Sequence, residues 1–187
     1  MARTNARIEL DRDERGIAAL EFALVLPALA LFLVGILSIY TAAQAGKEAS
    51  RAASTLSDLA TRVIEMDDFT RDAMFDTAAV ILSRFNGAST YTVSITSVIN
   101  PPDPPNQAPV DHAVDWSEAT ATDFAVTDDV LSRLELPSIS EGESFILVVV
   151  TGEYHAPVSG PLLQAKTEIV RTSVRRPRFV AEVPYVD

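Results

Sequence analysis

The sequence predicts an α+β protein in which a long N-terminal transmembrane helix precedes a small head domain with a mostly antiparallel β-sheet. Residues 17–40 form an apolar run, and residues 41–66 contain many helix formers and no proline. Polar and apolar residues alternate from residue 91, a pattern typical of half-buried strands. These changes divide the chain into a leader (1–16), a transmembrane helix (17–40), a helical extension (41–66) and an extracytoplasmic α+β head domain (67–187).

The apolar run is long enough to cross a bilayer. Its 24 residues include fourteen Leu, Ile, Val or Phe residues and a single charged residue, Glu21. A helix of this length spans about 36 Å, against about 30 Å for the hydrocarbon core. The large apolar side chains favour insertion by roughly 4–8 kcal/mol, whereas one acidic residue costs up to about 3 kcal/mol. The sequence therefore predicts insertion.

Charge around the helix predicts its orientation and limits the classes of partner. The leader holds four arginines and four acidic residues, and acidic residues contribute little to the positive-inside rule. We expect a cytoplasmic N-terminus, although Lys47 and Arg51 beyond the helix reduce the bias. The net charge of −11 argues against binding to nucleic acid, which depends largely on Lys and Arg. The absence of cysteine excludes disulfides and thiolate metal sites.

Two helices are predicted after the membrane. Leu56, Leu59, Val63 and Met66 form one stripe on a helix that continues from the membrane. Asp67 and Asp68 interrupt this helix and cap a second one, Phe69–Phe85, which Asn86-Gly87 ends. The core stripe of that second helix comprises Met74, Phe75, Ala78, Ile81, Leu82 and Phe85.

About four strands and one small helix follow. Tyr91–Val98 alternates with period two, and Ala113–Ala119, around Trp116, is predicted as a second strand. Between them, the proline-rich segment 100–110 is predicted as an exposed loop. Thr127 opens a short helix through Leu134. Phe145–Val150 is predicted as a central strand, and Gln164–Val174 as the last one.

Glu21 is the residue of the apolar run that most needs an explanation. A carboxylate inside an apolar helix requires a partner, although one near the end can also reach the headgroups. Arg15-Gly16 precedes the run, and Glu21 follows Ile17 by four positions. This arrangement resembles a type IV prepilin signal, in which a prepilin peptidase cuts after the glycine and releases a positive amine.

The string from Gly16 to Ile36 resembles the TadE/TadF/TadG-like pseudopilins of tight-adherence (Tad/Flp) type IVb pilus systems, in Gly16, Glu21, Phe22 and Pro27. The resemblance implies a pilin-like helix processed between Gly16 and Ile17. It also implies that Glu21 pairs with the new amine of a neighbouring subunit and that Phe22 and Pro27 take part in helix packing. Pro27 lacks a helix donor, so we expect a local kink or loosened turn there.

The same resemblance implies the location and partners of the protein. We expect a single-pass inner-membrane protein with a periplasmic head, which either enters a surface pilus or stays at its base. Its partners would be the prepilin peptidase, other pilins or pseudopilins, and the Tad assembly platform. Major pilins of these systems are very short and usually have Tyr after the Glu. Phe22 and the large head therefore indicate a minor pseudopilin.

Two other interpretations remain open at this point. Ala43-Gln44-Ala45 resembles a signal-peptidase site, which would release a soluble protein that begins at Gly46. Against this, the apolar run exceeds the usual length of a signal-peptide core. In the second alternative, the helix only tethers an extracytoplasmic binding domain unrelated to pili.

No motif in the sequence supports catalysis or a cofactor. His112 and His155 lack paired-ligand spacing, and there is no nucleophile motif or Walker A loop. We therefore predict a non-enzyme without metal. Arg175-Arg176-Pro177-Arg178 is the one basic cluster after the leader; it is interpreted as a solvated tail, with docking to an acidic surface as the alternative.

Overall fold

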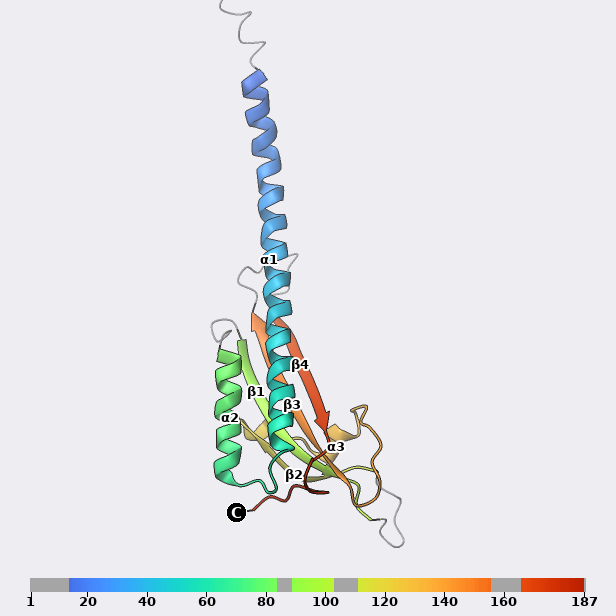
Figure 1. Ribbon diagram of the computed structural model, residues 1–187. Helices are drawn as coiled ribbons and strands as arrows, with labels where there is room; N and C mark the ends of the chain where they lie inside the picture. Colours follow the sequence, from blue (N-terminus) through green and yellow to red (C-terminus); the bar gives the residue numbers. More distant parts are fainter. Residues whose placement is uncertain (1–13, 84–88, 103–110, 156–165, 187) are drawn as a thin grey trace, which may run out of the picture. The chain divides into compact units, whose positions relative to one another are not determined.

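The computed structural model describes residues 14–83, 89–102, 111–155 and 166–186 (Figure 1). A single helix, α1 (Glu14–Ala60), is followed by a second helix and a four-stranded sheet, so the predicted α+β class is confirmed. The chain divides into two compact units at Tyr40 and Thr41, and α1 contributes to both. The second unit is called the head below.

All four strands of the head sheet pair antiparallel, in the order β2-β1-β3-β4. The predicted central strand FILVVV lies within β3 (Ser144–His155), between β1 (Ser89–Ile99) and β4 (Lys166–Arg175). The Trp-containing strand β2 (Ala113–Ala119) occupies one edge and β4 the other. Gln164 lies outside the described residues. The continuous apolar run of β3 follows from its position, because both of its faces are covered.

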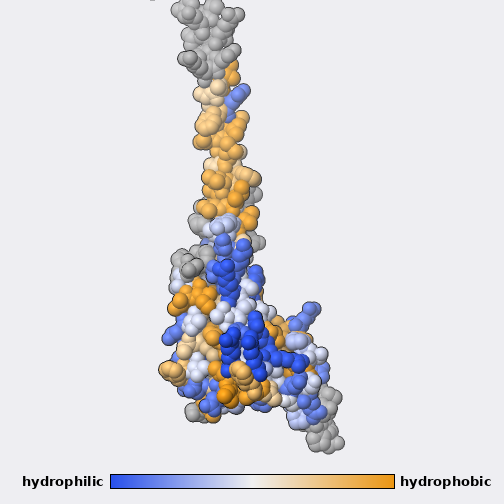
Figure 2. Space-filling view, in the orientation of Figure 1, coloured by the Kyte–Doolittle hydropathy of each residue, from blue (hydrophilic) through white to orange (hydrophobic). Residues whose placement is uncertain are grey.

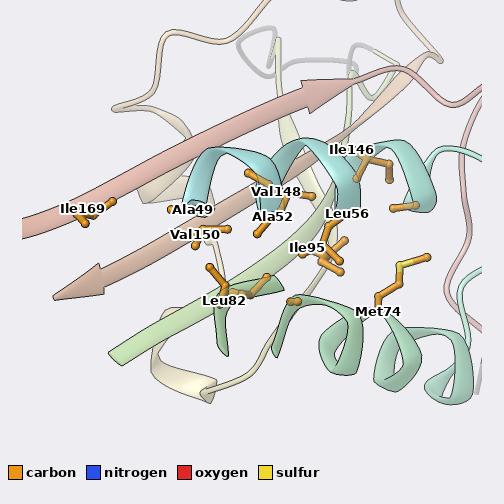
Figure 3. Packing of buried hydrophobic residues seen from close by; sticks show 14 of the residues in the cluster. Ala49, Ala52, Leu56, Met74, Leu82, Ile95, Ile146, Val148, Val150 and Ile169 are labelled. Carbon is orange, nitrogen blue, oxygen red and sulfur yellow. The ribbon is translucent and has the colours of Figure 1, made fainter. Parts of the chain in front are cut away.

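One face of the sheet packs against α1 and α2 (Asp68–Leu82), as Figures 1 and 3 show. Ala49 and Ala52 on α1 lie over Val148 and Val150 of β3, and Leu56 is fully buried beside Ile95. Small side chains allow the helix axis to approach the strands closely. The buried alanines recur at helical spacing, at positions 45, 49, 52, 53 and 60.

Helix α2 is stabilised by its N-cap residue and by the packing of its apolar stripe. The backbone N–H of Thr70 donates to Asp67 Oδ1 at 2.8 Å, so Asp67 is the N-cap, as predicted. Met74, Ala78 and Leu82 are buried against the sheet. The predicted stop at Asn86-Gly87, and Phe85, lie outside the described residues.

The expected extension of α1 to Met66 is wrong, because the helix ends at Ala60. Thr61 Oγ1 donates to the carbonyl of Asp58, and the Arg62 N–H bonds Leu59 O instead of continuing the α pattern. Met66 is nevertheless buried, since it forms a parallel bridge with Tyr185 of the C-terminal segment. A long-range bridge thus replaces the last predicted turn.

The second face of the sheet is covered by the segment between β2 and β3. A 3-10 turn, η3 (Thr122–Phe124), was not predicted, and α3 (Asp128–Leu131) is shorter than the expected helix. His112 packs within this segment. Its ring lies edge-on against Phe145, and its Nε2 lies 3.0 Å from the carbonyl oxygen of Pro137.

Gly152 on β3 lets the ring of Tyr91, on the neighbouring strand β1, pack closely against it. Its replacement by alanine should therefore destabilise the head. A Cβ atom there would lie 2.4 Å from a ring carbon of Tyr91 and 2.9 Å from the carbonyl oxygen of Thr90. We expect a loss of about 1–3 kcal/mol, typical of overpacking. Thermal unfolding of the full chain in detergent measures this loss. It should shrink when Tyr91→Ala is added; an equal loss in both backgrounds would contradict the explanation.

Candidate functional site

The part of α1 before Thr41 exposes an apolar surface on all sides. Figure 2 shows hydrophobic side chains over nearly the whole of this segment. Fourteen of its large apolar side chains are exposed, from Ile17 to Tyr40. Among the described residues, α1 is the one helix long and apolar enough to cross a membrane, consistent with single-pass anchoring. Such a helix needs lipid or other helices around it, because its surface is apolar all round.

Gly16 and Ile17 lie in the first turn of the described helix. A Cβ atom on Gly16 would meet nothing within 4 Å, so the fold itself does not require glycine there. The packing of α1 thus gives no structural reason for a glycine at this position.

Glu21 lies one turn after Ile17, and its side chain is exposed on the apolar surface. Within the described residues it forms no hydrogen bond or ion pair. A carboxylate in this position must find a partner from outside this chain segment or be neutralised. Phe22, the next residue, is 62% exposed and offers a large ring for packing against a partner helix.

Pro27 lies inside α1, and the helix continues on both sides of it. Proline removes the N–H that would bond the carbonyl four residues earlier, so one carbonyl of this turn lacks its usual donor. In an apolar environment that carbonyl favours contact with a neighbouring polar group.

The triplet Ala43-Gln44-Ala45, which resembles a signal-peptidase site, forms part of the head. Ala45 is fully buried in the core, and Thr41 shares a hydrogen bond with Tyr154 of β3. Cutting after Ala45 would remove that bond and leave apolar core surface open. Packing here opposes the secretion alternative.

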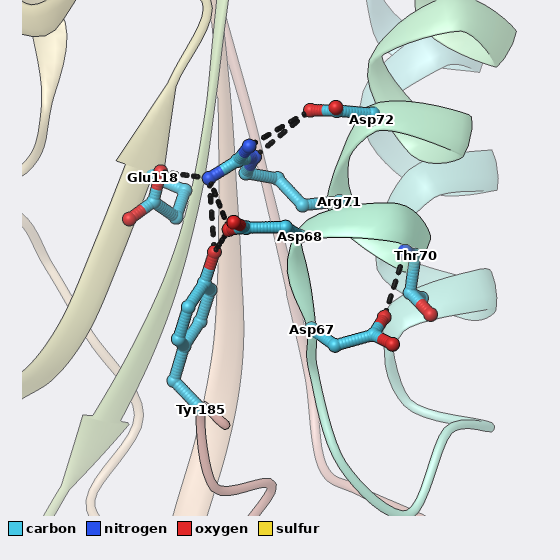
Figure 4. A network of polar contacts seen from close by, with 7 residues as sticks. All are labelled: Asp67, Asp68, Thr70, Arg71, Asp72, Glu118 and Tyr185. Atoms are coloured by element: carbon cyan, nitrogen blue, oxygen red, sulfur yellow. Dashed lines mark hydrogen bonds and ion pairs between the residues drawn. The ribbon is translucent and has the colours of Figure 1, made fainter. Parts of the chain in front are cut away.

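A polar cluster joins α2, β2 and the C-terminal segment of the head (Figure 4). Arg71 contacts Asp68, Asp72 and Glu118 at 2.7, 3.0 and 3.4 Å, and it donates to the hydroxyl of Tyr185 at 2.9 Å. The hydrogen bond to Asp72 raises the pKa of Arg71 above its ordinary, already high value. Burial, followed by the hydrogen bond to Asp68, raises the pKa of Tyr185 to about 12. The cluster therefore links α2, β2 and the C-terminal segment of the head.

A carboxyl pair between β2 and the C-terminal segment should make the head less stable as pH rises. Partial desolvation, the largest cause, raises the pKa of both Asp115 and Glu182, which lie at the surface of the head, and the charge of Asp115 raises the pKa of Glu182 further. The folded state then holds protons more tightly than the unfolded state. The stabilisation is complete below the usual carboxyl pKa of about 4 and is lost as pH rises through the raised values.

Melting temperatures between about pH 4 and pH 7 test this pair. The full chain in detergent should lose stability over that range relative to the Asp115→Asn variant, which removes one of the two charges. Parallel profiles for the two proteins would contradict the assignment.

Residues 16–56 match the family model described as TadE-like protein. No curated protein and no solved structure matches the chain. The match is consistent with a TadE-like protein associated with Tad pili. It covers the apolar segment and also the alanine-rich part of α1 that packs on the sheet.

The predicted site residues Gly16, Ile17, Glu21, Phe22 and Pro27 all lie on α1, within about three turns. Their roles stay predictions. Sequence reasoning missed the buried alanines of α1, although their recurrence every three or four residues was a usable signal. It also missed Arg71, because the partners of this residue come from three separate parts of the chain.

Proposed function

We propose that this protein is a minor pseudopilin of a Tad-type pilus, anchored in the inner membrane with a periplasmic head. One observation carries the proposal: the part of α1 from Ile17 to Tyr40, whose apolar side chains are mostly exposed, bears a single carboxylate and lies within the segment that matches the TadE-like family. A simple membrane tether has no use for that carboxylate.

Processing and pairing follow from the chemistry of the first turns. Hydrolysis of the Gly16–Ile17 bond leaves an α-amine on Ile17, and Glu21 of an adjacent subunit can neutralise it. Each charge alone is costly in hydrocarbon, whereas the pair is tolerated. Pairing thus favours subunits that pack side by side through their apolar helices, with Phe22 and the turn at Pro27 in the contact.

The mature N-terminus tests the proposal directly. Protein is purified from membranes of cells with the pilus genes intact and analysed by mass spectrometry, beside a Gly16→Ala variant. We expect a chain that begins at Ile17 in the wild type and an uncut chain in the variant. The variant should fold normally, since an added methyl at Gly16 meets nothing.

Other termini would decide between the alternatives. A start at Gly46 would show signal-peptidase cleavage and overturn the pilin role. An uncut wild-type chain would leave the anchor standing and favour the tethered binding domain.

A further inference from the structure

Asp58 of α1 is surrounded by three arginines. Its carboxylate lies 2.6 Å from Arg62, 2.5 Å from Arg178 and 3.7 Å from Arg175. The basic cluster at the C-terminal end is thus bound to the head, and its interpretation as a solvated tail is wrong. One carboxylate neutralises only one of the three charges. The arginine side chains remain about half exposed, so a positive excess faces solvent.

The positive surface continues along α1 and β4 toward the start of the head. The guanidinium of Arg171 lies 3.0 Å from where a Cβ atom of Gly46 would be, next to Lys47. Arg51, one turn further, pairs with the nearly buried Glu48. Hydrophilic side chains gather on this face in Figure 2. We call it the basic face; it comprises Lys47, Arg51, Arg62, Arg171, Arg175 and Arg178, with Glu48 and Asp58.

The cluster at Arg71 has the opposite arrangement of charges from the one at Asp58. Here one guanidinium, 23% exposed, lies among three carboxylates, of which Asp68 and Asp72 are 70% and 67% exposed. The negative excess extends along α2 to the exposed Asp76. We call this the acidic face; it comprises Asp68, Asp72, Asp76 and Glu118, with Arg71.

The two faces belong to opposite edges of the sheet. Arg175 ends β4, whereas Glu118 lies on β2, and the strand order places β1 and β3 between them. Within one copy the faces therefore do not meet. Between two copies they complement each other in charge, and one rotation and translation could repeat the contact.

We propose that the basic face binds the acidic face of a second copy of this chain, head to tail. The proposal extends the assembly function above by naming one partner, but it does not depend on cleavage at Gly16. Single surface ion pairs contribute little, whereas several complementary pairs orient the encounter and exclude like-charged approaches. Phe69, 82% exposed at the start of α2, adds an apolar contact at the acidic face.

Confinement and net charge favour a second copy over an unrelated partner. Two copies held in one membrane meet at a high effective concentration, so weak complementary contacts suffice. The chain carries a net charge of −11, and copies repel one another in most orientations. When the basic face of one copy meets the acidic face of another, the two copies attract each other.

Charge-reversal variants of the full chain in membranes test the contact. In the first, Lys47→Glu is combined with Arg62→Glu; in the second, Asp72→Lys is combined with Asp76→Lys. The cysteine-free chain allows clean reporters: Thr55→Cys in one copy and Ala73→Cys in the other, joined by a bismaleimide. Melting curves verify that each variant folds.

We expect each variant alone to lose cross-linked dimer about tenfold, because like charges then face each other. Mixing the first variant, carrying Thr55→Cys, with the second, carrying Ala73→Cys, should restore it, since the reporters then join the reversed basic face to the reversed acidic face. The wild-type yield should fall as salt is added. Retained cross-linking in either variant, or no rescue on mixing, overturns the proposal.

Two controls separate this proposal from others. Copies that all carry Thr55→Cys should not cross-link, and a product there would indicate a symmetric contact and overturn the head-to-tail arrangement. Cross-linking should persist in the uncut Gly16→Ala variant. A wild type that begins at Ile17 yet fails to cross-link would overturn the head contact alone and leave the pilin role intact.

Discussion

Replacing Glu21 with leucine should abolish pilus assembly while the amount of protein in the membrane stays unchanged. Leucine favours insertion more than glutamate does, so the anchor should persist. In the proposed pairing, the amine of a neighbouring Ile17 would lose its partner and remain charged in hydrocarbon, which is costly. Electron microscopy of surface pili, with immunoblots of membranes, measures the two outcomes.

A matched pair of variants isolates the charge. Glu21→Gln keeps the size and polarity of the side chain but cannot neutralise an amine, and it should fail like leucine. Glu21→Asp keeps the charge and should retain part of the assembly. Full piliation in Glu21→Leu would remove the pilin hypothesis and favour a plain tether.

Replacing Leu56 with alanine should strongly destabilise the head. Leu56 is fully buried where α1 faces β1 and β3 (Figure 3), among alanines too small to fill the space that it would leave. Comparable leucine truncations cost about 2–5 kcal/mol. In a head of this size each kcal/mol lowers the melting temperature by about 2–4 °C.

Leu59→Ala provides the control for that truncation. This leucine lies on the same helix but is only partly buried, so its loss should be clearly smaller. Thermal unfolding of both variants in detergent measures the difference. Equal losses would show that α1 is held to the sheet by something other than the packing of Leu56.

Local patterns were sufficient for most individual elements. The apolar run, the Asp67 cap and the Trp116 strand were all predicted, because each depends on residues close together in the sequence. The unbroken apolar stretch at Phe145 correctly predicted a central strand, since a strand covered on both faces has no polar side to alternate with. The match over residues 16–56 agrees with the resemblance at Gly16 and Glu21.

Long-range contacts decided what the sequence did not show. Helix α1 ends at Ala60, and Met66 forms a bridge with Tyr185, which is far away in the chain. The C-terminal arginines are fixed by Asp58, and Arg71 is fixed by carboxylates from α2 and β2. Hydrophobic periodicity predicts which residues are buried, because the spacing of apolar residues decides which face of a helix or strand is apolar. Only the tertiary structure decides which charges far apart in the chain meet, because an ion pair between distant residues leaves no pattern in either partner's local sequence.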